Sequence, residues 1–257
     1  HMRVKQIIFL ALSFLFAFGV GMFGFWFGSS TDKHSREILS EHKTEDAFAN
    51  YQNIENRITT VFAHKEMYRD FFDYPRFVNA PSEKINSLVL PHHLVAGNFV
   101  AGVFDSVKNL RPPVVVVIGP NHYGVGKGFI LSTKLGWETP SGVLESHSFL
   151  IEDIGKSNLI SLEDTAFINE HSIGALAPFI KNTWPQTKII PLIIKNIKND
   201  ELADGLAAKL YEVLPAGSLV IASVDFSHYL PKNLADFHDD LSINVLATGD
   251  LDRIKKM

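Results

Sequence analysis

The chain has 257 residues, of which 46% are hydrophobic and 20% charged, a balance typical of a globular protein with room for one sizeable α/β domain plus an appendage, or for two small domains. Its net charge of −4 at pH 7 argues against non-specific nucleic-acid binding, which requires a basic surface. Because the chain has no cysteine, disulfides, thiolate nucleophiles and sulfur-ligated metals are excluded.

The first predicted element is an uncharged apolar segment over residues 7–28. A helix of that length spans roughly 33 Å, enough to cross the hydrocarbon core of a bilayer. A cleavable signal peptide is the alternative, but its apolar region is shorter and ends in small residues, whereas this segment ends in FWFG. We therefore expect a single-pass transmembrane anchor within residues 1–30. Arg3 and Lys5 precede it and favour a main domain outside the cytoplasm.

Beyond the anchor, residues 31–74 are polar and compatible with helix, and we interpret them as a juxtamembrane stalk that packs on the domain. Apolar strands and amphipathic helices alternate over residues 75–257. Strands are expected at 85–90, 114–118, 128–133, 188–194 and 218–222, and helices at 95–110, 173–184 and 201–214. Short, continuously apolar strands separated by helices predict an α/β domain with a central, mostly parallel or mixed sheet flanked by helices.

Three of these strands are followed directly by histidine. His92, His122 and His228 come after the apolar runs NSLVL, VVVVI and LVIAS. Because ligands of such sheets bind beyond the carboxyl ends of the strands, we expect these imidazoles to meet in one site. Imidazoles without a thiolate suit iron(II), zinc, manganese or copper(II). The remaining candidates for this chemistry are His93, the pair Glu170 and His171, and Asp225.

Each candidate also has a purely structural interpretation. A single histidine after a strand is often a loop or capping residue, and His93 could simply flank His92 and face away. Asp225 could cap the following turn, and Glu170 with His171 could begin a helix, whose N-terminus favours an acid. Other common sites have less support, because the sequence contains no dinucleotide-binding G-x-G-x-x-G after a strand, no phosphate loop and no G-x-S-x-G nucleophile turn.

Five segments between residues 88 and 229 resemble, in the same order, those of the Memo family, known in prokaryotes as AmmeMemoRadiSam system protein B. LVLPHHLVAGNFVAG is similar to its PHAGYxxSG segment, and VVVIGPNHYG to GPNHxG. WETPSG, NEHSIGALAPFI and SVDFSHY are similar to W-x-TPLG, EHSxExxLPFL and SSDxSHY. The resemblance implies the fold of the catalytic subunit of class III extradiol dioxygenases, which are non-haem iron enzymes.

The resemblance also implies His92 and His122 as metal ligands, with iron(II) as the expected ion and copper or zinc as alternatives. Ser227 stands where animal members have a cysteine, which leaves the third ligand open among His171, Asp225 and His228. These three residues are also the candidates for catalytic groups. Further departures from the family pattern are Gly174 for a glutamate, Phe167 for a histidine and His93 for an alanine.

Three functions follow as expectations: a membrane-anchored, metal-dependent redox enzyme, a non-catalytic protein- or peptide-binding module that keeps the pocket, and a zinc-type metallohydrolase. The substrate, a small molecule or a protein, is not encoded in any recognisable residue cluster. The resemblance suggests radical-SAM and AMMECR-like proteins as pathway partners. Family members continue with a CGxxP segment that is not found here, which suggests that the sequence is a fragment.

Overall fold

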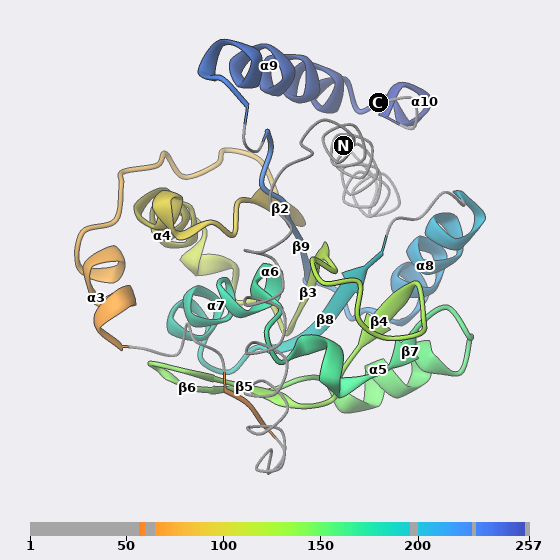
Figure 1. Cartoon of the computed structure of the whole chain (residues 1–257). Coiled ribbons are helices and arrows are strands. Elements are labelled where there is room, and N and C mark those ends of the chain that lie inside the picture. The colour runs from red at the N-terminus through yellow and green to blue at the C-terminus, as the bar shows by residue number, and fades with distance from the viewer. Residues whose placement is uncertain (1–56, 60–64, 196–199, 228–229, 255–257) are drawn as a thin grey trace, which may run out of the picture.

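A computed structural model describes residues 57–59, 65–195, 200–227 and 230–254 (Figure 1). The predicted anchor over residues 7–28 and most of the predicted stalk lie outside the described residues. Within the described ranges, no helix has both the length and the apolar composition that crossing a bilayer requires.

The centre of the fold is a six-stranded sheet with the strand order β2-β9-β3-β8-β4-β7. Its strands are β2 (Ser87–Leu90), β3 (Val114–Pro120), β4 (Ile130–Ser132), β7 (Ser161–Leu162), β8 (Lys188–Ile194) and β9 (Leu219–Ser223). The strands β2, β9, β3 and β8 are parallel, β4 runs antiparallel to β8, and β7 is parallel to β4. The sheet is thus mixed, with four parallel strands at its centre and one end, which confirms the prediction of a mostly parallel or mixed sheet.

Helices cover both faces of this sheet (Figure 1). They are α3 (Lys65–Asp73), α4 (Gly97–Ser106), α5 (Ser148–Gly155), α6 (His171–Gly174), α7 (Ala177–Thr183) and α8 (Asp200–Val213). Val116 of β3 packs with α5 and α8, whereas its neighbour Val117 packs on the opposite side with α3, α4 and α7. Because successive side chains of a strand point to opposite faces, a strand covered on both sides must be apolar at every position, which explains the unbroken valine run.

Two predicted helices are each divided in the structure. Helical structure over residues 95–110 consists of the 3₁₀ helix η2 (Leu94–Ala96), α4 and the 3₁₀ helix η3 (Lys108–Leu110). The predicted helix over residues 173–184 consists of α6 and α7, and Pro178 lies in the first turn of α7. Proline has no N–H to donate and fits a first helical turn, where that donor has no partner, so a new helix begins there.

A second, three-stranded sheet was not predicted. It has the order β1-β5-β6 and consists of β1 (Arg57–Ile58), β5 (Gly136–Thr139) and β6 (Gly142–Leu144). The turn between β5 and β6 ends at Gly142, whose φ of 104° is readily adopted only by glycine. Trp137 of β5 is fully buried, so this small sheet extends the hydrophobic core beneath α7.

The helix α3 lies within the range predicted as a stalk, and it packs on the α/β domain. Tyr68 is completely buried, and its hydroxyl donates a hydrogen bond to the carbonyl oxygen of Ala175 at 2.9 Å. Its ring also contacts the ring of Phe179 edge-to-face, with centroids 5.2 Å apart. The segment just before residue 75 is thus fastened to the helices on one face of the sheet.

The carboxyl ends of β2, β9 and β3 lie side by side at one edge of the sheet, because the three strands are parallel neighbours. The chain leaves these ends in loops that carry His92, Asp225 and His122 respectively. After β9 the chain continues into α9 (Lys232–Thr248) and α10 (Leu251–Ile254), which were not predicted. The sheet therefore brings three segments that are distant in sequence to the same place.

Candidate metal centre

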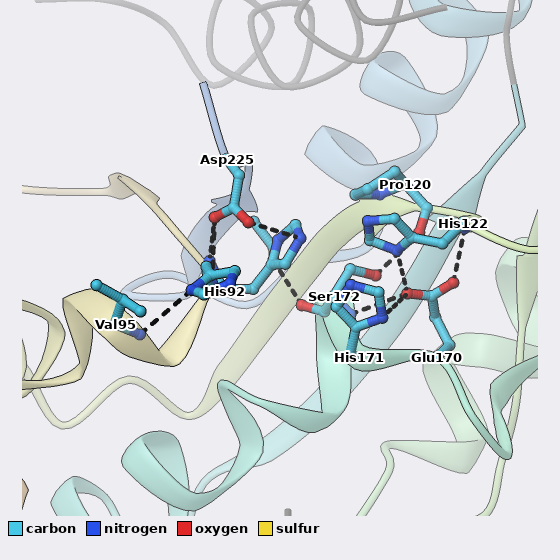
Figure 2. Close-up of polar contacts among 10 residues, drawn as sticks. His92, Val95, Pro120, His122, Glu170, His171, Ser172 and Asp225 are labelled. Atoms are coloured by element: carbon cyan, nitrogen blue, oxygen red, sulfur yellow. Dashed lines mark hydrogen bonds and ion pairs between the residues drawn. The ribbon is translucent and has the colours of Figure 1, made fainter. Parts of the chain in front are cut away.

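Three imidazoles gather at this edge of the sheet, those of His92, His122 and His171 (Figure 2). Each offers one ring nitrogen that lies within 4.8 Å of the other two, an arrangement that could hold a metal ion. The rings of His122 and His171 are stacked with centroids 3.8 Å apart, and the ring of His92 stands across them at 5.1 and 5.3 Å. The structure thus brings the two predicted ligands together and adds the imidazole of His171.

His122 is oriented by Glu170, the residue before α6, whose side chain is buried. The Nδ1 of His122 lies 2.7 Å from Glu170 Oε1, and the backbone N–H of His122 donates to Oε2 at 2.8 Å. Since a carboxylate can only accept, the proton of the neutral imidazole resides on Nδ1 and the lone pair of Nε2 stays available. Such a carboxylate partner is typical of metal-ligating histidines.

Glu170 also caps α6, because the backbone N–H of Ser172 donates to its Oε1 at 2.9 Å. Burial would raise the pKa of Glu170, but the hydrogen bonds from His122 and Ser172 outweigh it and hold the pKa below the ordinary value. The group is therefore a carboxylate at neutral pH. The structural interpretation of Glu170 as a helix cap is confirmed, and the same side chain also orients an imidazole.

His92 is the most buried of the three imidazoles, with 3% of the residue exposed. Its Nδ1 lies 3.0 Å from Ser223 Oγ, and its Nε2 lies 3.3 Å from Asp225 Oδ2 without forming a hydrogen bond to any described residue. Burial lowers the pKa of His92 to about 4, against the attraction of Asp225, and burial also lowers the pKa of His171. Both rings are neutral at pH 7, which is the form that binds metals.

Asp225 ties the loop after β9 to the loop after β2. Its Oδ1 accepts hydrogen bonds from the backbone N–H groups of His92 at 2.8 Å and of His93 at 3.1 Å. Its Oδ2 faces His92. One carboxylate oxygen thus positions the loop that carries His92, while the other lies at the edge of the imidazole cluster.

The remaining sequence candidates are placed differently. His93 is exposed, and its Nδ1 accepts a hydrogen bond from the backbone N–H of Val95 at 3.3 Å, so this imidazole serves as a cap and takes no part in the cluster. The backbone N–H of Ser227 donates to Asp239 Oδ1 at 3.0 Å. His228 lies outside the described residues.

Two serines of the site were not identified from the sequence. Ser172 and Ser223 are completely buried and join His92 to the backbone around α6 and β3. The available signal was their position inside the segments EHSIG and SVDFSHY, each next to a candidate residue. Serines are common in apolar segments and do not by themselves indicate a site. Only the structure shows which acceptor each hydroxyl contacts.

The donor set fits a divalent cation of the first transition series. Neutral imidazoles suit iron, zinc, copper and nickel, and three of them supply enough ligands while leaving positions open. Metal–nitrogen bonds of about 2.0–2.1 Å require ligand nitrogens no more than about 4.2 Å apart, so a slight inward movement of the rings would close the cluster. The rings of His122 and His171 are partly exposed, so they are less confined by neighbouring side chains than the ring of His92.

A mixed α/β sheet with a cluster of imidazoles beyond its parallel strands defines this chain as an α/β protein with a candidate metal centre. A family model described as Memo-like protein matches residues 49–256, and the chain therefore belongs to the Memo-like family. This confirms the resemblance seen in the sequence motifs, and a relation to class III extradiol dioxygenases is consistent with it.

Curated relatives agree with this assignment. A MEMO1 family protein of Caldivirga maquilingensis is 34% identical over 160 residues, which cover 60% of this chain and 56% of the relative. The MEMO1 family protein MTH_45 of Methanothermobacter thermautotrophicus is 32% identical over 65% of this chain and 62% of its own length. One from Aquifex aeolicus is 31% identical over 65% and 63%. The chain thus spans less than two thirds of the length of these relatives.

Proposed function

We propose that the chain binds one divalent metal ion through His92, His122 and His171 and acts as a metal-dependent redox enzyme with iron(II). The observation that carries the proposal is the meeting of three imidazoles, two of them neutral through burial, at the carboxyl edge of the sheet. Bound iron(II) would supply one-electron and oxygen chemistry.

The surrounding residues have distinct tasks in this proposal. Glu170 holds the ring of His122 and keeps its Nε2 free of a proton, while Asp225 fixes the backbone of the His92 loop and adds negative charge beside the ion. The place of His171 in the cluster favours a ligand over the acid–base group expected from the sequence. Asp225 and His228 remain the candidates for proton transfer.

Metal analysis of the full chain, purified without oxygen, tests the proposal. The wild-type protein is expected to take up stoichiometric iron(II), and His92→Ala, His122→Ala and His171→Ala should each lose it. His93→Ala is the matched control, because this neighbouring imidazole is exposed and directed at a backbone N–H. Full iron occupancy in the three cluster variants would contradict the assignment of the ligands.

A second candidate function is zinc-dependent hydrolysis, which the third imidazole favours. Three histidines are the ligand set with which zinc activates a bound water, whereas iron oxygenases commonly use two histidines and a carboxylate. The two functions are separated by comparing oxygen consumption of the iron-loaded protein with ester hydrolysis by the zinc-loaded protein. A loaded protein with neither activity would favour the non-catalytic binding module.

Membrane attachment is a separate part of the proposal and rests on the composition of residues 7–28. The full chain is expected in the membrane fraction of expressing cells and should be released by detergent but not by salt. A variant without residues 7–28 should move to the supernatant. Salt extraction of the full chain would overturn this part and leave the metal site unaffected.

A further inference from the structure

Two buried serines lie behind His92, and the hydroxyl of each donates to a backbone carbonyl oxygen. Ser223 at the end of β9 and Ser172 in α6 are both completely buried. Ser223 Oγ lies 3.0 Å from His92 Nδ1 and donates a hydrogen bond to the carbonyl oxygen of Ser172 at 2.5 Å. Ser172 Oγ in turn donates to the carbonyl oxygen of Pro120 at 2.9 Å.

The positions of the protons in this arrangement follow from the acceptors. A carbonyl oxygen carries no proton, so the close contact between Ser223 Oγ and the carbonyl oxygen of Ser172 requires the hydroxyl proton of Ser223 between them. A serine has only one O–H, and its oxygen can therefore only accept from His92. The proton of the neutral His92 ring then resides on Nδ1, and Nε2 carries the lone pair.

We propose that Ser223 is a positioning residue that holds His92 in the Nδ1–H tautomer and so presents the Nε2 lone pair to a metal ion. This inference rests on the proposed metal-binding function and deepens it. Ser172 supports the arrangement by supplying, through its carbonyl oxygen, the acceptor that fixes the hydroxyl of Ser223.

The surroundings of Nε2 agree with this tautomer. Nε2 is buried and makes no hydrogen bond within the described part of the chain. Asp225 Oδ2 lies 3.3 Å away, where it would be the natural acceptor of an Nε2–H group. With the proton on Nδ1, two atoms that both carry lone pairs face each other, which is unfavourable until a cation lies beside them. The hydroxyl of Ser223 thus works against a simple histidine–aspartate hydrogen bond and in favour of a metal.

Because Gly119 has no side chain, Ser172 and Ser223 can pack directly against it. A Cβ at Gly119 would lie 2.5 Å from Ser172 Oγ and 3.5 Å from the Cβ of Ser223. Any larger residue at this point of β3 would push Ser172 away from its position. Gly119, in the segment VVVVIGPNH, therefore allows the two serines to take the positions that fix the tautomer of His92.

The tautomer can be measured on the metal-free wild-type chain by ¹⁵N NMR of the histidine rings, which distinguishes protonated from unprotonated ring nitrogens. The His92 signals are assigned by their loss in His92→Gln. The expected result is a protonated Nδ1 and an unprotonated Nε2. A protonated Nε2 would overturn the inference whatever the protein does with metals.

The role of the hydroxyl is tested with Ser223→Ala and the matched control Ser132→Ala. Ser132 of β4 is also completely buried. Its hydroxyl donates to the carbonyl oxygen of Pro191 at 2.8 Å, and this hydrogen bond does not involve a histidine. Ser223→Ala should bind iron(II) and zinc about 10- to 100-fold more weakly, as is usual when the partner of a ligating histidine is removed. It should also move the His92 proton to Nε2, whereas Ser132→Ala should change neither property.

The outcomes separate this inference from the proposed function. Unchanged metal affinity and an unchanged tautomer in Ser223→Ala would overturn the role of Ser223, while metal binding by the wild type would still support the proposed function. A wild-type protein with the Nδ1–H tautomer that takes up neither iron(II) nor zinc would overturn the proposed function, and with it the purpose assigned to Ser223. Loss of affinity together with the shifted proton supports both.

Discussion

Glu170 shows how much one buried side chain can organise. Its two oxygens accept hydrogen bonds from the backbone N–H and ring Nδ1 of His122 and from the backbone N–H of Ser172. It therefore joins the loop after β3 to the start of α6 and sets the direction of one imidazole. Three donors on a carboxylate are also what keep its pKa low despite burial.

Replacing Glu170 by glutamine removes the charge but keeps the shape. Because an amide nitrogen cannot accept, either the backbone N–H of His122 or both the ring Nδ1 of His122 and the backbone N–H of Ser172 lose their acceptor. The ring of His122 is then held less firmly, and we expect the metal affinity to fall about 10- to 100-fold. The free energy of unfolding should fall by about 1–3 kcal/mol. Metal titration and urea unfolding measure the two effects. Glu152→Gln, at an exposed ion pair with Lys134, should leave metal affinity unchanged.

The low pKa of His92 predicts a pH dependence of stability in the metal-free protein. Below pH 6.5 the unfolded chain takes up a proton on His92, whereas the folded chain does so only near pH 4. The unfolded state then binds more protons, so stability falls as the pH decreases from about 6.5 to about 4, by roughly 3 kcal/mol at most from this residue. Urea unfolding with a chelator at several pH values measures the slope. His92→Gln should flatten it, and an identical slope in that variant would contradict the assignment.

At the scale of elements, the strands of the six-stranded sheet other than β7 were predicted, whereas those of the three-stranded sheet were not. Lys188–Ile194 forms a strand with the predicted bounds, because a strand buried on both faces is apolar throughout. The strands β1, β5, β6 and β7 have two to four residues each and lie in no longer apolar run of the sequence, unlike the equally short β2 and β4. The meeting of His92 and His122 followed from parallel strand ends. The inclusion of His171 depends on how α6 packs on β3, which no local pattern encodes.

Tyr68 connects α3 to the rest of the domain, and its replacement should lower the free energy of unfolding. Tyr68→Phe leaves the carbonyl oxygen of Ala175 without its donor, which should cost about 0.5–1.5 kcal/mol of unfolding free energy. Tyr68→Ala also removes a fully buried ring and should cost about 3–5 kcal/mol. Urea unfolding gives both values. Tyr211→Phe, at an exposed tyrosine, should change stability by less than about 0.5 kcal/mol.

At the scale of the whole molecule, the cluster joins parts of the chain that are far apart in sequence. His92 and His122 follow β2 and β3, His171 is the first residue of α6, and Asp225 reaches the same place from β9. The sheet holds these segments together. The match of the family model over residues 49–256 includes all of them, so the site and the fold belong to one unit.

An ion that binds this folded cluster and not the unfolded chain must raise stability. At a free concentration 100 times the dissociation constant, the expected gain is about 2.7 kcal/mol. Thermal unfolding with added iron(II) or zinc should therefore occur at higher temperature, and a chelator should reverse the change. His122→Ala should show no metal-dependent gain, and a gain as large as that of the wild type would contradict the proposed site.

The two predicted ligands, His92 and His122, follow strands that differ in their number of hydrogen-bonded neighbours. β3 has a neighbour on each side, whereas β2, which leads to His92, is paired only with β9 among the described strands. Segments with fewer packing and hydrogen-bonding partners open at a lower free-energy cost than core strands. We expect amide hydrogens of β2 to exchange faster than those of β3, and metal to slow this exchange. Opening of β2 at the margin of the sheet would displace the loop that carries His92 while the loop that carries His122 stays in place.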